Sequence, residues 1–271
     1  MDETLNPTDR AVVLVHGTRT SHTQWDPQLP AFREAGYRVF APDFPGHGTR
    51  RGEQFTTAAA TDTITAAIAE ASAQVGPGRV HLIGASLGGM IAIHAAGTLA
   101  DELNHPLASV TVFGSAVQPT RLTAAAYAGM VALGDRIPGA RATISPETGD
   151  PVQPWLFRYL IGSDETACGY RGGRADIPTV RAAMRTAGEL DLVAALYRIP
   201  VPVAIVSPRF DQLRLHERRF AAAAPKGRLV KLPYGSHAVN VAHPDRFNAD
   251  LLQILAHNEG AGWAGPVIAR A

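Results

Sequence analysis

The chain contains 271 residues, of which 46% are hydrophobic and 18% are charged, and its formal net charge is +1. This composition supports a large buried core and excludes an intrinsically disordered chain. The near-neutral charge gives no electrostatic reason to expect nucleic acid or an anionic membrane as a partner. The single cysteine, Cys168, excludes an internal disulfide, which fits a reducing cytoplasm.

The polar N-terminal segment lacks the basic start and the apolar stretch of a signal peptide. No apolar run approaches the ~20 residues that are needed to span a bilayer. We therefore expect a cytoplasmic protein that acts on a small molecule and has neither a nucleic-acid nor a membrane partner. The sequence leaves the oligomeric state open, a homodimer included.

Six short apolar runs predict buried strands. Each run is continuously or nearly continuously apolar, which is typical of parallel strands that are covered on both faces. In chain order the predicted strands are residues 11–15, 37–41, 80–83, 109–113, 201–206 and 227–232.

Helical segments are predicted between these strands. Asp26 would cap a helix over residues 27–36, an Ala-rich helix follows over residues 57–75, and a third helix over residues 87–99 comes directly after a strand. Alternation of strand and helix favours an α/β fold with a doubly wound, mostly parallel sheet. Near the end, Pro244 opens a helix whose apolar stripe is formed by Phe247, Leu251 and Leu255.

The alternation breaks in the span of residues 117–196, which lies between two predicted strands. This span holds helix-like pieces and loop-like pieces rich in glycine and proline. We interpret it as a helical cap that is inserted into a core domain formed by residues 1–116 and 197–271. Residues 258–271 are expected to form an irregular tail. The helix-like pieces of the cap are residues 122–133, 155–161 and 179–187.

The segment Gly84-Ala85-Ser86-Leu87-Gly88 matches the pattern Gly-x-Ser-x-Gly. It lies between a predicted strand and a predicted helix, which is the context that this nucleophile motif requires. Glycines two residues to either side relieve the crowding of a very tight turn. The turn would raise the Ser86 hydroxyl above the sheet and leave the Leu87 N–H at a helix N-terminus, free to bind an oxyanion. The alternative is a glycine-rich loop without chemistry.

His237 is the predicted general base among ten histidines. A serine hydroxyl needs such a base, and His237 lies in a loop after the last predicted strand, where parallel sheets carry their chemistry. Asp211 follows the strand at residues 201–206 and is predicted to orient the imidazole, which gives the chain order Ser, Asp, His. The alternatives are a solvated loop histidine and a surface aspartate paired with Arg209.

Acyl transfer passes through a tetrahedral oxyanion, which needs at least two preorganised hydrogen-bond donors. The Leu87 N–H is one predicted donor. The Thr18 N–H, at the end of the first strand, is the natural second, and Gly17 lets the backbone approach closely.

These motifs together resemble the α/β-hydrolase superfamily over nearly the whole chain. The resemblance implies that Asp43 and the Pro-Gly-His-Gly segment after it are structural, and that the insertion covers the substrate pocket. Only about ten residues precede the first strand, and in this the chain is similar to the plant methylesterase and hydroxynitrile lyase group. The resemblance is carried by His16-Gly17, Trp25, Asp43-Phe44-Pro45-Gly46-His47-Gly48, Gly84-Ala85-Ser86-Leu87-Gly88-Gly89, Asp211 and His237.

We therefore expect a serine hydrolase that cleaves small to medium apolar carboxylic esters or lactones through an acyl-enzyme, with no cofactor and no metal. Gly17 beside the nucleophile and the cap residues Tyr127, Trp155 and Phe157 are the expected substrate-binding residues. The alternatives are a hydroxynitrile lyase or a carbon–carbon bond hydrolase on the same fold, and a non-catalytic ligand-binding protein.

Two positions separate ester hydrolysis from cyanohydrin cleavage. The lyases of the resembling group have a threonine at the position of Gly17 and a lysine after the catalytic histidine. Here the residue after His237 is Ala238, which offers no charge to a departing cyanide. The sequence therefore favours hydrolysis.

Overall fold

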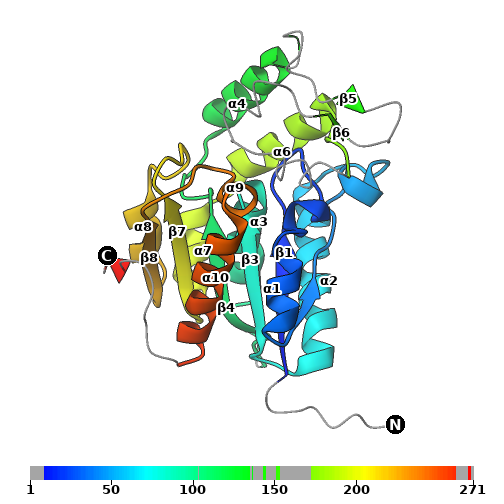
Figure 1. Ribbon diagram of the computed structural model, residues 1–271. Coiled ribbons are helices and arrows are strands. Elements are labelled where there is room, and N and C mark those ends of the chain that lie inside the picture. The colour runs from blue at the N-terminus through cyan, green and yellow to red at the C-terminus, as the bar shows by residue number, and fades with distance from the viewer. Residues whose placement is uncertain are drawn as a thin grey trace.

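The computed structural model of the protein describes residues 9–102, 104–134, 136 and 172–260, together with the backbone of residues 143–144, 151–152 and 268–269. Within this part of the chain, a central sheet carries helices on both faces, and further helices lie above one end of the sheet (Figure 1).

The sheet has seven strands in the order β2-β1-β3-β4-β7-β8-β9, and the first six are parallel. All six predicted strands are confirmed, with shifts of a few residues at their ends. The parallel strands are β1 (Arg10–Val15), β2 (Tyr37–Phe40), β3 (Val80–Ala85), β4 (Leu107–Phe113), β7 (Val203–Pro208) and β8 (Gly227–Leu232).

The prediction of an irregular tail over residues 258–271 was wrong in one respect. Within it, β9 (Ile268–Ala269) pairs antiparallel with β8. A strand at the edge of a sheet leaves a row of backbone groups unpaired, and a short apolar segment of the same chain can satisfy some of them.

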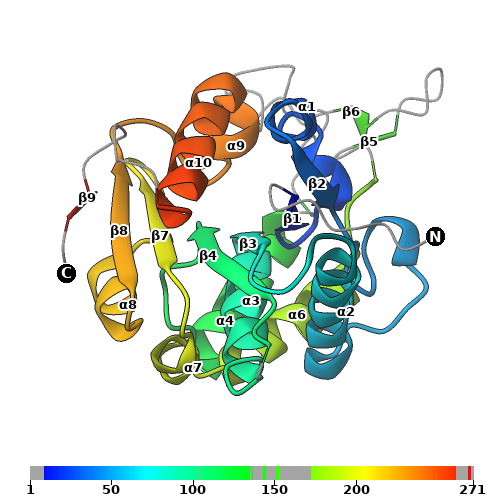
Figure 2. The same cartoon turned by 90° about the horizontal axis from the view of Figure 1, so that it is seen from below.

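Helices cover both faces of the sheet, as Figure 2 shows from below. One face carries α2 (Thr57–Val75), α3 (Leu87–Thr98), α7 (Leu192–Arg198) and α8 (Glu217–Ala223). The other carries α1 (Leu29–Glu34), α9 (Val239–Ala242) and α10 (Pro244–Asn258). Among the described helices, none is both long enough and apolar enough to cross a membrane.

Two apolar clusters hold these layers together, one on each face of the sheet. In β1, Val13 and Val15 belong to one cluster and Val12 and Leu14 to the other, which explains why the strand is continuously apolar. The predicted stripe of the last helix is also confirmed, because its three side chains are buried in the second cluster. These are Phe247, Leu251 and Leu255.

The start of α1 differs from the prediction. Asp26 does not cap this helix; it ends a preceding 3₁₀ turn, η1 (His22–Trp25), where its N–H donates to Thr23 O at 3.2 Å. The Ser21 hydroxyl caps that turn by accepting from the Thr23 N–H at 3.3 Å. The residue that acts as a cap is thus Ser21, and it caps a short 3₁₀ turn that precedes α1. The helix α1 itself starts only at Leu29.

Above the carboxyl ends of the strands, α4 (Arg121–Gly134) and α6 (Ile177–Glu189) pack against each other (Figure 1). Two short strands, β5 (Thr143–Ile144) and β6 (Pro151–Val152), form a separate antiparallel pair. In contrast, α7 packs beside the sheet against α3 and α8. The division of the chain at residues 117 and 196 stays a prediction, and the helix expected over residues 155–161 lies outside the described residues.

Candidate active site

Ser86 lies at the junction of β3 and α3, with φ 54° and ψ −123°. This conformation is unfavourable for a residue with a side chain, and such strain persists only where the surroundings enforce it. A Cβ on Gly84 would lie 2.6 Å from Gly89 Cα, and one on Gly88 would lie 2.3 Å from His16 O. The crowding inferred from the motif is therefore real, and part of it comes from the end of β1.

Backbone and side-chain contacts hold this turn in place. The Ser86 N–H donates to Phe113 O at 2.9 Å, and the Met90 N–H donates to Ser86 O at 3.1 Å. The Ser115 hydroxyl also donates to Ser86 O, at 2.9 Å. The end of β4 thus holds the N–H of the strained residue, while the loop after β4 and the first turn of α3 hold its carbonyl.

Three side chains from three separate loops converge at this turn. Ser86 Oγ lies 3.0 Å from His237 Nε2, and His237 Nδ1 lies 3.1 Å from Asp211 Oδ1. The side chain of His237 is 27% exposed, whereas that of Asp211 is only 1% exposed. In the tautomer with its proton on Nδ1, facing the buried carboxylate, His237 would present an unprotonated Nε2 to the serine hydroxyl, which is the geometry of a general base.

The loop that carries Asp211 is joined to the loop that carries His237. The N–H groups of Arg209 and Phe210 donate to Tyr234 O at 3.1 Å and to Gly235 O at 3.0 Å. Asp211 Oδ1 also accepts from the Leu213 N–H at 2.8 Å. Two backbone hydrogen bonds thus position Asp211 in the loop that follows Pro208, the last residue of β7.

Gly114, just past β4, faces the same pair. A Cβ on Gly114 would lie 2.8 Å from His237 Cε1 and 3.5 Å from Asp211 Oδ2. The absence of a side chain here leaves the space that the histidine ring and its carboxylate occupy.

The two residues predicted to supply oxyanion donors adjoin Ser86, Leu87 in the sequence and Thr18 through its neighbour Gly17. Leu87 is the first residue of α3, and the first N–H groups of a helix have no partner inside the helix. A Cβ on Gly17 would lie 3.3 Å from Ser86 Cβ, so the turn that carries Thr18 begins directly beside Ser86. The Gly17 N–H is itself engaged by Gln24 Oε1 at 2.8 Å, a contact that no sequence motif signalled.

Other histidines near this edge have their ring atoms committed elsewhere. His16 is fully buried; its Nδ1 lies 2.8 Å from Gly17 O, and its Nε2 accepts from the Phe44 N–H at 3.0 Å. Burial lowers the pKa of His16 to about 3, so this ring is neutral. His22 Nδ1 lies 2.9 Å from Asp43 Oδ2.

Asp43 organises the loop after β2, as the resemblance implied. Its carboxylate accepts from the backbone N–H groups of His22 and Thr49, at 2.7 Å and 2.8 Å, and from the Thr49 hydroxyl at 2.8 Å. Burial alone would raise the pKa of Asp43, but these hydrogen bonds outweigh burial and lower the pKa to about 2.

The expected substrate-binding residues of the cap are only partly described. Tyr127 on α4 is half-buried against the core cluster, and burial raises the pKa of its hydroxyl while the charge of Arg19 opposes the rise. Trp155 and Phe157 lie outside the described residues. Arg19, which sequence reasoning missed, directly follows Thr18 and has a left-handed φ of 65°.

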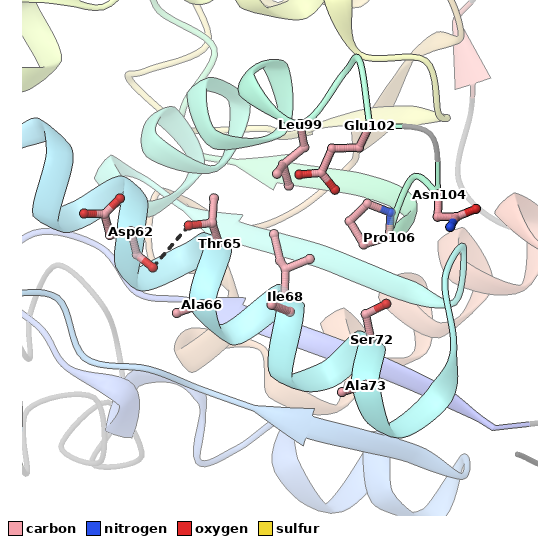
Figure 3. A pocket seen from close by; sticks show the side chains of 11 residues that line it. Asp62, Thr65, Ala66, Ile68, Ser72, Ala73, Leu99, Glu102, Asn104 and Pro106 are labelled. Carbon is pink, nitrogen blue, oxygen red and sulfur yellow. Dashed lines mark hydrogen bonds between the residues drawn. The ribbon is translucent and has the colours of Figure 1, made fainter. Parts of the chain in front are cut away.

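A separate cavity of about 740 Å³ lies between α2 and the segment after α3 (Figure 3). Its lining includes Ile68, Leu99 and Pro106, with Asp62 and Glu102 among the polar side chains. The 12 residues of α3, which rises ~1.5 Å per residue, separate Leu99 from Ser86, so this cavity is not the candidate site. Among the described residues, no group of three histidine, cysteine or acidic side chains is arranged to hold a metal ion.

Residues 12–250 match the family model described as the alpha/beta hydrolase family. The chain belongs to the alpha/beta hydrolase family. The predicted fold and the resemblance to the superfamily are thereby confirmed, and membership supports a hydrolase in general terms without naming a substrate. The similarity to the plant methylesterase and hydroxynitrile lyase group stays a prediction.

Named relatives cover nearly the whole chain. A protein of Variovorax paradoxus with the name carbamate hydrolase RutD is 28% identical over 96% of this chain and 97% of its own. A pimeloyl-[acyl-carrier protein] methyl ester esterase of Aeromonas hydrophila is 26% identical over 92% and 95%. A carboxylesterase structure from Nitrososphaera gargenis superposes with a TM-score of 0.69 at 16% identity, covering 94% and 93%, which supports the fold alone.

Proposed function

We propose that the protein is a serine hydrolase that cleaves small to medium apolar carboxylic esters or lactones through an acyl-enzyme. The observation that carries the proposal is the continuous chain Ser86–His237–Asp211, with distances of 3.0 Å and 3.1 Å. A serine with a positive φ, beside a helix N-terminus and a histidine, has the nucleophile, base and oxyanion donors of acyl transfer in one place.

The proposed reaction has two halves. Ser86 Oγ attacks the substrate carbonyl carbon while His237 Nε2 takes the hydroxyl proton, and the N–H groups of Leu87 and Thr18 bind the oxyanion. The tetrahedral intermediate collapses, and His237 gives its proton to the departing alcohol. Water then attacks the acyl-enzyme with the same base, releases the acid and restores the Ser86 hydroxyl. Throughout, Asp211 balances the charge of the imidazolium.

Ester cleavage is favoured over cyanohydrin cleavage by the space beside the nucleophile. A side chain at position 17 would begin 3.3 Å from Ser86 Cβ, in the region next to the proposed nucleophile. Gly17 leaves this region open, and Ala238 supplies no cation for a cyanide ion.

The test is a series of p-nitrophenyl esters of graded acyl length, with Ser86→Ala as control. We expect enzyme-dependent hydrolysis of the apolar esters that disappears in the variant. Activity confined to anionic substrates would contradict the apolar preference. A p-nitrophenyl carbamate belongs in the series, because one relative is named for that substrate class.

A second comparison separates hydrolase from lyase. The enzyme is incubated with phenyl acetate and with mandelonitrile, and release of phenol is compared with release of benzaldehyde. We expect phenol release to be faster. Faster benzaldehyde release that Ser86→Ala abolishes would establish the lyase instead.

A further inference from the structure

The carboxamide of Gln24 lies directly behind the turn that carries the proposed oxyanion donor. Gln24 is buried, with 8% of its surface exposed, and its Oε1 accepts from the Gly17 N–H at 2.8 Å. A Cβ on Gly17 would lie 3.5 Å from Gln24 Oε1 and 3.3 Å from Ser86 Cβ. Gly17 is therefore sandwiched between this carboxamide and the nucleophile.

The peptide group between Gly17 and Thr18 is also held by side chains. The Gly17 carbonyl lies 2.8 Å from His16 Nδ1, and the Thr20 hydroxyl lies 2.9 Å from this carbonyl and 2.8 Å from Gln24 Oε1. The Gly17 C=O and the Thr18 N–H belong to one trans peptide plane and point in opposite directions. Holding the carbonyl on one side therefore fixes the direction of the Thr18 N–H on the other.

A pair of buried amides connects Gln24 to the loop of the base. Asn240 Nδ2 donates to Gln24 O and to Gln28 Oε1, each at 3.2 Å, and Gln28 Nε2 donates to Asn240 O at 2.7 Å. Asn240 follows His237 by three residues, and both Asn240 and Gln28 are fully buried. These three hydrogen bonds join the segment of Gln24 and Gln28 to the segment that follows His237, although Asn240 Oδ1 has no partner among the described residues.

We propose that Gln24 is a positioning residue that presets the oxyanion hole and keeps it in register with His237. Glycine has the greatest backbone freedom of any residue, so Gly17 needs external contacts to hold one conformation. The Gln24 side chain supplies one of these contacts, and the Gln24 backbone carbonyl, which accepts from Asn240 Nδ2, ties the turn to the segment that follows His237. This inference rests on the proposed acyl-transfer function.

The test is the variant Gln24→Met, which keeps the side-chain length but removes the acceptor for the Gly17 N–H. Loss of an oxyanion donor costs about 10²–10³ in turnover, so a misdirected donor should lower kcat by roughly 10-fold to 10²-fold and leave KM nearly unchanged. Affinity for a trifluoromethyl ketone, which forms a tetrahedral oxyanion with the serine, should fall by the same factor as kcat/KM. Gln74→Met, which removes an exposed contact with Arg38, is the matched control and should change neither quantity.

Three outcomes separate the two proposals. If the wild-type enzyme and Ser86→Ala are equally inactive on esters, the proposed function fails. If the wild type is active and folded Gln24→Met keeps wild-type kcat and ketone affinity, the role of Gln24 is overturned. If Gln24→Met does not fold, Thr20→Val decides: a several-fold loss of kcat with KM retained supports the inference, and an unchanged kcat overturns it.

Discussion

Two hydrogen-bonded chains of side chains, each made of a serine, a histidine and a carboxylate, lie at this sheet, one near each end of β3. At the carboxyl end, Ser86, His237 and Asp211 form the candidate site. Near the amino end, His81 Nδ1 lies 2.8 Å from Ser109 Oγ, and its Nε2 lies 2.9 Å from Glu259 Oε1. Five residues of strand, at ~3.3 Å each, separate His81 from Ser86, so the two chains are roughly 16 Å apart along β3.

The difference between the two chains is in their surroundings. The His81 side chain is 1% exposed, whereas that of His237 is 27% exposed. Ser109 is fully buried within β4, whereas Ser86 has a left-handed φ of 54° and directly precedes α3 as its N-cap residue. The same three residue types thus make a structural link in one place and a candidate catalytic site in the other, because only one place offers access and oxyanion donors.

Glu259 makes the structural character of the second chain plain. This residue ends α10, and its carboxylate accepts from the Tyr37 hydroxyl at 3.0 Å and pairs with Arg10 as well as with His81. The C-terminal helix is thereby attached to the starts of β1, β2 and β3. We infer that the contacts among Ser109, His81 and Glu259 stabilise the fold and take no part in turnover.

The largest expected contrast is between the two serines. Ser86→Ala should leave the fold intact and lower esterase turnover by several orders of magnitude, on the order of 10⁶ where the three residues act as a unit. Ser109→Ala should keep turnover within about twofold of wild type. Steady-state kinetics with one ester measures both, and near wild-type turnover in Ser86→Ala would remove Ser86 from the mechanism.

The two carboxylates should differ nearly as much. Asp211→Asn is expected to lower kcat by ~10⁴, because an amide cannot hold the tautomer that leaves Nε2 free. Glu259→Gln should leave kcat unchanged. A loss below tenfold in Asp211→Asn would mean that another carboxylate serves His237, and Asp191 and Asp245 would be the next variants.

Stability should show the opposite order. Ser109→Ala leaves a buried ring nitrogen of His81 without its partner, which costs about 1–3 kcal/mol in the free energy of unfolding. Ser86→Ala should cost less, or even stabilise the fold, because alanine removes no buried partner from the partly exposed His237 ring. Urea unfolding of the two variants measures the difference. Equal losses in the free energy of unfolding would contradict the structural role inferred for Ser109.

The smallest expected effect is on acid sensitivity. Burial alone would raise the pKa of Glu259, but hydrogen bonds from His81 and Tyr37 outweigh burial and hold this pKa below its usual value. A pKa that is lower in the folded than in the unfolded chain stabilises the fold at neutral pH, and this stabilisation is lost as the pH falls through the two values.

Between about pH 5 and pH 3, the free energy of unfolding should therefore fall less in Glu259→Gln than in the wild type. The difference should be below about 1 kcal/mol, because the carboxylate is partly exposed. Parallel acid profiles for the two proteins would show that Glu259 contributes no pH-dependent stability.

The strands and the tight turn at Ser86 could be predicted from the sequence because each depends on a local pattern. Continuous apolar runs identify strands that are buried on both faces, and the Gly-x-Ser-x-Gly motif states the steric needs of a tight turn. Ser86, Asp211 and His237 were chosen by their places after strands, and the structure brings them together. Their catalytic roles stay predictions.

The contacts that the sequence could not predict are those between distant segments. In the sequence, Gln24 is an ordinary polar residue before Trp25. Its hydrogen bond with the Gly17 N–H forms only because a 3₁₀ turn folds the chain back. The Ser109–His81 contact spans two strands and resembles no motif. Neither pairing has a local signal, because both are set by sheet register and loop closure.

The most direct test of the central claim is labelling of the wild-type protein with a fluorophosphonate, followed by mapping of the modified residue by mass spectrometry. Such a probe reacts with a serine only where a base activates the hydroxyl and donors stabilise the adduct. We expect a single label on Ser86, which Ser109→Ala retains and Ser86→Ala loses. A label on Ser109, Ser115 or Ser207, or no label on an active enzyme, would contradict it.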